Sequence, residues 1–140
     1  MTISQTQADA LIARLKEASR RDTLDWAMGR TPDELVVAVD DGRLHFLLSL
    51  NRYPFDLRFH FRTRDRNIGL VRLHAAPLHL NPDGTELRGQ PHLHVYRAGH
   101  ELAFAEPVDW YDVNNPLATL GRFLDVIQTR FPFGIQLDLA

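Results

Sequence analysis

The chain has 140 residues, of which 44% are hydrophobic and 24% charged, which suits one domain with a buried core and excludes a disordered chain. The formal net charge of −2, with the histidines neutral, argues against a generally basic surface that coats nucleic acid. There is no cysteine, so disulfides and thiolate metal sites are excluded, and the composition fits a reducing cytoplasm.

The N-terminal segment is predicted to form an amphipathic helix from about Ser4 to Arg20. Apolar residues recur in this segment at intervals of three and four positions. They are Ala8, Leu11, Ile12, Leu15 and Ala18. Ser4 and Gln7 have the spacing of a capping box, which favours a helix start at this point.

No segment has the pattern of a targeting or membrane element. Residues 1–16 lack the basic start and the continuous apolar run of a signal peptide. No apolar run approaches the roughly 20 residues that a membrane-spanning helix needs. We therefore expect a cytoplasmic protein with no membrane partner.

Four segments between residues 34 and 74 are predicted to form a meander of strands. Residues 34–39 and 43–51 flank the turn sequence Asp-Asp-Gly and favour a hairpin. The next segment alternates apolar and polar residues, so one set should face the core and the other should face away. The core-facing set is Phe55, Leu57, Phe59 and Phe61, and the outward set is Asp56, Arg58, His60 and Arg62. Residues 68–74 return as the fourth strand, which favours an antiparallel sheet.

The second half of the chain adds a loop, further strands and a second helix. Residues 75–84 are interpreted as a loop, and residues 91–97 and 101–105 as strands. Asn115 followed by Pro116 predicts a helix start, and this helix should stop before Pro132. Residues 134–139 are predicted to form a short last strand. The sequence therefore predicts one α+β domain over residues 1–140, a mainly antiparallel β-sheet flanked by an N-terminal helix and a late C-terminal helix.

Four histidines stand out as candidate functional residues: His74, His79, His92 and His94. His92 and His94 should share one face of their strand, with Leu93 and Val95 on the other. Three interpretations remain open. The histidines are plain surface residues, or they bind a divalent metal whose third ligand is His74, His79, Glu86 or Glu101. In the third, they act as general acid and base on a phosphodiester.

The basic residues are unusual because 15 arginines stand against one lysine, Lys16. Six of the arginines fall between positions 52 and 72, where only two aspartates accompany them. This grouping predicts a local basic face that contacts an anion. Arg72, which shares a strand face with His74, is a candidate phosphate ligand together with Arg58 and Arg62. His60 lies between Arg58 and Arg62 on the same face and suggests a further anion contact.

The segment from Arg72 to Pro107 resembles small uncharacterised prokaryotic proteins, and in particular the TumE-like toxin family of toxin–antitoxin gene pairs. Those proteins carry an arginine, then an Asp-Asn-Ala-Pro-His-like run, then a Pro-His-His-like run. The matching positions here are Arg72, Ala76, Pro77, His79, Pro91 and His92. His74 and Ala75 replace the Asp-Asn pair. The resemblance implies a mobile-element or defence-linked setting and no established substrate.

The leading hypothesis is a toxin-like or defence-associated protein that acts on RNA or nucleotides as a nuclease. His92 and His94 would be catalytic together with His74 or His79, and the three candidate arginines would bind phosphate. One alternative is a non-catalytic binding module for a protein partner, such as an antitoxin or a phage component. Another is a metal-dependent enzyme of unknown reaction. The sequence fixes neither the cofactor nor the oligomeric state.

Overall fold

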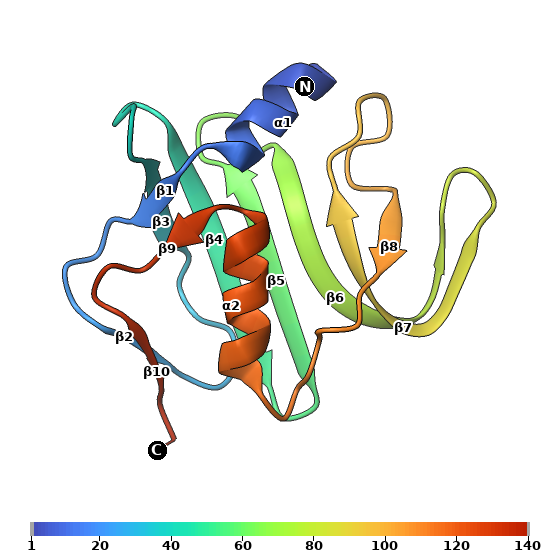
Figure 1. Cartoon of the computed structure of the whole chain (residues 1–140). Coiled ribbons are helices and arrows are strands. Elements are labelled where there is room, and N and C mark those ends of the chain that lie inside the picture. The colour runs from blue at the N-terminus through green and yellow to red at the C-terminus, as the bar shows by residue number, and fades with distance from the viewer. Residues whose placement is uncertain (1, 140) are drawn as a thin grey trace.

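An eight-stranded sheet is the framework of the structure, a computed structural model that describes residues 2–139 (Figure 1). In spatial order the strands are β8 (Ala105–Pro107), β7 (Glu86–Val95), β6 (Gly69–Leu80), β5 (Asp56–Thr63), β4 (His45–Tyr53), β3 (Glu34–Ala38), β1 (Lys16–Ala18) and β9 (Thr129–Arg130). Every neighbouring pair is antiparallel except β1 and β9. The predicted mainly antiparallel sheet is confirmed.

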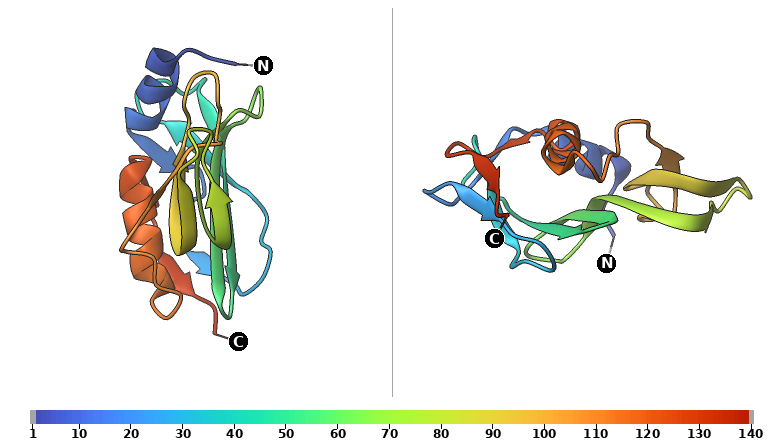
Figure 2. Two further views of the ribbon diagram at one scale, coloured as in Figure 1. Left: turned by 90° about the vertical axis from the view of Figure 1, so that its right-hand side faces the viewer. Right: turned by 90° about the horizontal axis from the view of Figure 1, so that it is seen from below.

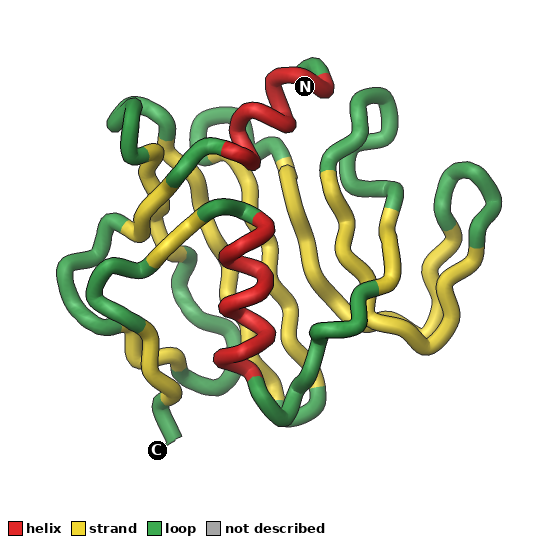
Figure 3. The backbone as a smooth tube through the Cα atoms, viewed as in Figure 1, coloured by secondary structure: helices red, strands yellow, loops and turns green. Residues whose placement is uncertain are grey.

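Two helices, α1 (Gln5–Ala13) and α2 (Pro116–Val126), cover one face of this sheet (Figures 2 and 3). The core lies between them and the sheet, where Phe123 of α2 meets the ring of Phe59 edge-on. Asn115 caps α2 by accepting a hydrogen bond from the backbone N–H of Ala118. The predicted α+β class, with an early and a late helix, is therefore confirmed. No helix of residues 2–139 is long and apolar enough to cross a membrane.

The N-terminal helix is shorter than its sequence pattern predicted. The capping box of Ser4 and Gln7 is present, but α1 ends at Ala13 instead of Arg20. Residues 16–18 form β1, which lies between β3 and β9 and gains ladder hydrogen bonds on both sides. Tertiary pairing thus overrides a helical periodicity that continues through this segment.

Three other local predictions were wrong. Phe55 is 90% exposed, because Tyr53 pairs with Asp56 and leaves Phe55 in the tight turn between β4 and β5. Residues 75–80 are not a loop but the outer half of β6, because they pair with β7. The strand after β7 is β8 and does not begin at residue 101.

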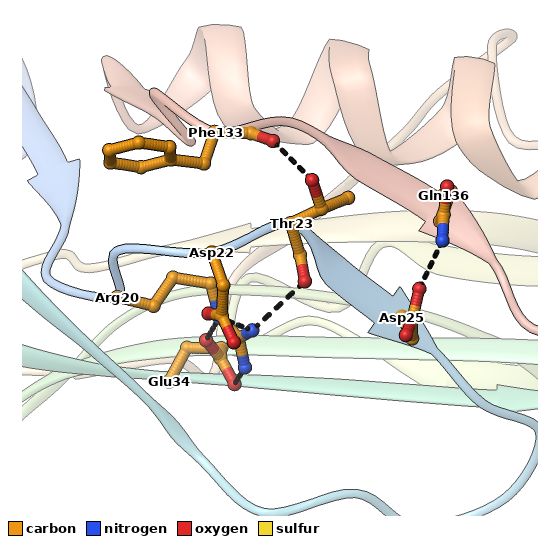
Figure 4. Close-up of polar contacts among 7 residues, drawn as sticks. All are labelled: Arg20, Asp22, Thr23, Asp25, Glu34, Phe133 and Gln136. Carbon is orange, nitrogen blue, oxygen red and sulfur yellow. Dashed lines mark hydrogen bonds and ion pairs between the residues drawn. The ribbon is translucent and has the colours of Figure 1, made fainter.

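A small parallel sheet pairs β2 (Leu24–Trp26) with β10 (Ile135–Leu137), which lies near the C-terminal end of the described chain. The hydroxyl of Thr23 donates to the carbonyl of Phe133, and the side chains of Gln136 and Asp25 also form a hydrogen bond (Figure 4). β2 and β10 form a sheet separate from the one that contains β6 and β7. Their contacts therefore support the fold without shaping the histidine region.

The hairpin of β6 and β7 bends sharply and becomes U-shaped, as Figure 1 shows. Both strands keep one register through the bend, where Gly89 adopts a left-handed conformation with φ of 61°. Glycine reaches this conformation without the steric cost that other residues incur. Residues 97–107, which include β8, lie between the two arms of the U. The predicted histidines lie on this bent hairpin, so its shape determines how close they come to one another.

Candidate functional site

The four predicted histidines converge inside the U-shaped hairpin. The ring centroids of His74, His79, His92 and His94 lie 4.7 to 6.2 Å apart in the five closest pairs. The cross-strand pairing of His74 with His92 accounts for part of this cluster. His79 would point to the opposite face of an unbroken strand. The bend at Gly89 instead turns it toward the others.

Two backbone carbonyls fix the orientation of this histidine cluster. Nδ1 of His94 donates to the carbonyl of Leu102 at 2.7 Å, and Nε2 of His79 donates to the carbonyl of Ala103 at 2.9 Å. Nε2 of His74 lies 2.8 Å from Nε2 of His94. Burial lowers the pKa of His74 and of His94 to about 4, so both rings are neutral near pH 7.

His92 and His94 are fully buried, which makes the interpretation as plain surface histidines wrong. Both have 0% exposure, whereas Val95 on the supposed apolar face is 38% exposed. Residues 97–107 cover the histidine face and reverse the predicted pattern. Neither ring nitrogen of His92 has a hydrogen-bond partner within the described chain, and burial lowers the pKa of this ring too. In this conformation neither His92 nor His94 is exposed to a substrate.

The cluster does not have the geometry of a metal centre. Within residues 2–139, no three histidine, cysteine or acidic side chains are arranged so that they could hold a metal ion. Glu86 is exposed and forms an ion pair with Arg88. Glu101 lines a separate cavity, described below. The arrangement therefore gives no support to the metal-dependent alternative.

Most of the predicted basic face is neutralised. Arg58 forms an ion pair with Asp56, and Arg62 forms one with Asp33, each at 2.6 Å. Two further arginines use their guanidinium groups within the fold. They are Arg52, bound to the carbonyls of Trp26 and Asp138, and Arg64, beside His45. Arg58 and Arg62 therefore contribute little free positive charge.

Arg72 is the exception among the predicted phosphate ligands. Its side chain has no ion pair, and its Nε is buried without a hydrogen-bond partner among residues 2–139. It stands opposite His60 of β5 and opposite His94 of β7, so all three share one face of the sheet. Nε2 of His60 is also buried without a partner. Burial lowers the pKa of His60 to about 4, so this ring is neutral as well.

Arg72 and His60 line a cavity of about 360 Å³, which we call the anion pocket. Its walls include Arg66, Gly69, Glu101 and Leu102. A Cβ atom at position 69 would lie 2.6 Å from Cδ1 of Leu102 and 3.1 Å from Nε2 of His60, so the pocket depends on glycine there. Arg66 was not singled out in the sequence, because its place in a turn gives no sign that it reaches this cavity.

A family model that covers residues 3–129 matches the chain; its description is a family of unknown function, DUF6978. The chain belongs to this family. No curated protein and no solved structure matches the chain. Because the function of DUF6978 is unknown, membership of this family indicates no activity, and it does not link the chain to the TumE-like toxins. That resemblance stays a prediction.

Proposed function

We propose that this protein binds RNA and holds one backbone phosphate in the anion pocket. The observation that carries the proposal is the half-buried guanidinium of Arg72, which has no acidic partner and no acceptor for its Nε within residues 2–139. Burial lowers the pKa of Arg72, because removing the charged guanidinium from water is unfavourable when no opposite charge is close by. A phosphate would supply both the charge and the acceptor oxygens.

The chemistry of the pocket suits phosphate better than a neutral ligand. Arginine presents several N–H donors in a planar fork that matches two phosphate oxygens. Nε2 of His60 can add a third donor when its proton sits on that nitrogen. Arg66 lines the same cavity, and no side-chain partner of Arg66 occurs among the described residues. Three donor groups thus surround one small space.

Replacing Arg72 by glutamine should weaken RNA binding. Charge-assisted hydrogen bonds contribute about 1.5 to 3 kcal/mol, so we expect the dissociation constant to rise about 10-fold or more. Fluorescence anisotropy with a labelled single-stranded RNA measures this change. Arg88→Gln is the matched control, because Arg88 is exposed, lies on the outer arm of the hairpin and already pairs with Glu86. Equal affinities of the two variants would contradict the proposal.

In the cell, the proposed RNA binding would serve a toxin-like or defence-associated role. Induced expression of the wild type in a bacterial host should then slow growth, and Arg72→Gln should relieve the effect at the same protein level. Growth that is inhibited equally by both folded proteins would instead favour the non-catalytic module that binds a protein partner. Unimpaired growth with the wild type would remove the toxin-like role.

A further inference from the structure

His74 is a partly buried member of the cluster, and only one of its two ring nitrogens has a hydrogen-bond partner among residues 2–139. Nδ1 of His94 donates to the carbonyl of Leu102, so a neutral His94 must present a lone pair at Nε2. Nε2 of His74, 2.8 Å away, is therefore the donor in this contact. The hydrogen-bond network thus assigns the single proton of His74 to Nε2 and leaves a lone pair on Nδ1.

This lone pair is accessible and lies near the anion pocket. The His74 ring is only partly buried, and Nδ1 is not among the buried nitrogens that lack a partner. Arg72 lies two residues earlier on the same face of β6, about 7 Å away along the strand. A proton acceptor and a phosphate ligand thus stand side by side on one surface.

We propose that His74 is the general base of an RNA-cleaving reaction at the phosphate held by Arg72. This inference rests on the proposed RNA binding. His74 takes the proton of the ribose 2′-hydroxyl onto Nδ1, and the 2′-oxygen forms a bond to the adjacent phosphorus. The bond from phosphorus to the 5′-oxygen breaks, the departing oxygen takes a proton from water, and the hydroxide left behind takes the proton back from Nδ1 of His74. The products are a 2′,3′-cyclic phosphate and a 5′-hydroxyl end.

RNA is the substrate that this arrangement fits, because each of its phosphates lies beside a hydroxyl nucleophile that DNA lacks. The site then needs only to bind the phosphate, stabilise its developing charge and accept one proton. His94 acts as a positioning residue, because its contact with Leu102 fixes the proton of His74 on Nε2. The same logic governs histidine tautomers in hydrolases, where a partner group orients the base.

The test compares the wild type with His74→Gln on a labelled RNA. The amide nitrogen of glutamine can still donate to His94, but glutamine cannot serve as a base. We expect the cleavage rate to fall about 100-fold or more while the dissociation constant changes less than about 2-fold. An RNA with 2′-deoxyribose at every position should bind and stay intact. This second probe needs no variant, so it holds even if His74→Gln fails to fold.

Each result separates the two proposals. A wild type that binds RNA without cleaving it would overturn the role of His74 and leave the binding function intact. Cleavage at equal rates by the wild type, His74→Gln and Arg72→Gln would also overturn it. Products with a 3′-hydroxyl end would have the same effect, because the 2′-oxygen would not be the nucleophile. A wild type that does not bind RNA would overturn both proposals.

Discussion

Replacing Lys16 by methionine should destabilise the fold by about 3 kcal/mol, one of the largest effects expected for a single substitution in this chain. Lys16, the sole lysine, is 1% exposed. Its Nζ donates to the backbone carbonyls of Ile12, Arg14 and Ile127 at 2.7 to 2.8 Å. One side chain therefore ties the end of α1 to the end of α2.

The expected loss comes from the carbonyl groups that methionine would leave without a donor. Buried acceptors that lose their partner keep the full cost of desolvation. The rings of Phe46 and Phe61 also lie 5.4 and 5.2 Å from Nζ and attract a cation. Burial lowers the pKa of Lys16 to about 7, yet even the neutral amine keeps two N–H donors for these carbonyls.

Urea denaturation at pH 7, followed by circular dichroism, measures the change for Lys16→Met. Arg14→Met is a suitable control, because Arg14 is adjacent in the fold but its ion pair with Asp40 is exposed at 3.3 Å. Exposed ion pairs contribute roughly 0 to 1 kcal/mol, so this variant should unfold near the wild-type midpoint. A stability of Lys16→Met within 0.5 kcal/mol of the wild type, roughly the scatter of neutral surface substitutions, would show that the three bonds contribute little.

The sequence predicted the elements whose signals are local. The alternation of β5, the turn between β3 and β4, and the cap formed by Asn115 and Pro116 each depend on a few neighbouring residues, and each appears in the structure. Lys16 was noted only as the single lysine. Its role depends on Ile127, which is 111 positions away in the chain. No periodicity in the sequence reports such a contact.

The histidine region shows the same limit more sharply. Spacing correctly placed His92 and His94 on one strand face but did not predict which face would be covered. That outcome depends on residues 97–107, which return between the arms of the hairpin. The convergence of His79 depends on the bend at Gly89, because a straight strand would have turned it away. The sequence likewise could not distinguish Arg72 from Arg58 and Arg62 as a phosphate ligand, because the ion pairs of Arg58 and Arg62 appear only in the structure.

Acidification from pH 7 to pH 4.5 should destabilise the protein by several kcal/mol through the buried histidines. In the folded state, burial lowers the pKa of His60, His74 and His94 to about 4, against 6.5 for an ordinary histidine. Between these two values the unfolded chain binds more protons than the folded chain. Stability is therefore greatest above about pH 6.5 and is lost as the pH falls toward 4.

The size of the effect follows from the three rings together. One unit of pKa corresponds to about 1.4 kcal/mol, and with the discount for the partial exposure of His60 and His74 each ring contributes about 1 to 3 kcal/mol. Their sum is comparable to the total stability of a typical domain, about 5 to 15 kcal/mol. We therefore expect the urea midpoint to fall steeply between pH 7 and pH 4.5.

His60→Leu isolates the contribution of one ring, because leucine fills the same half-buried position and cannot bind a proton. The variant should lose about one third less stability than the wild type between pH 7 and pH 4.5. Urea midpoints at both pH values, with the denaturant slope checked for constancy, measure the difference. Wild-type midpoints that do not change with pH would mean that the imidazoles become protonated without opening the segment at residues 97–107. In that case the cluster would be hydrated in solution, and His92 and His94 would be accessible to a substrate.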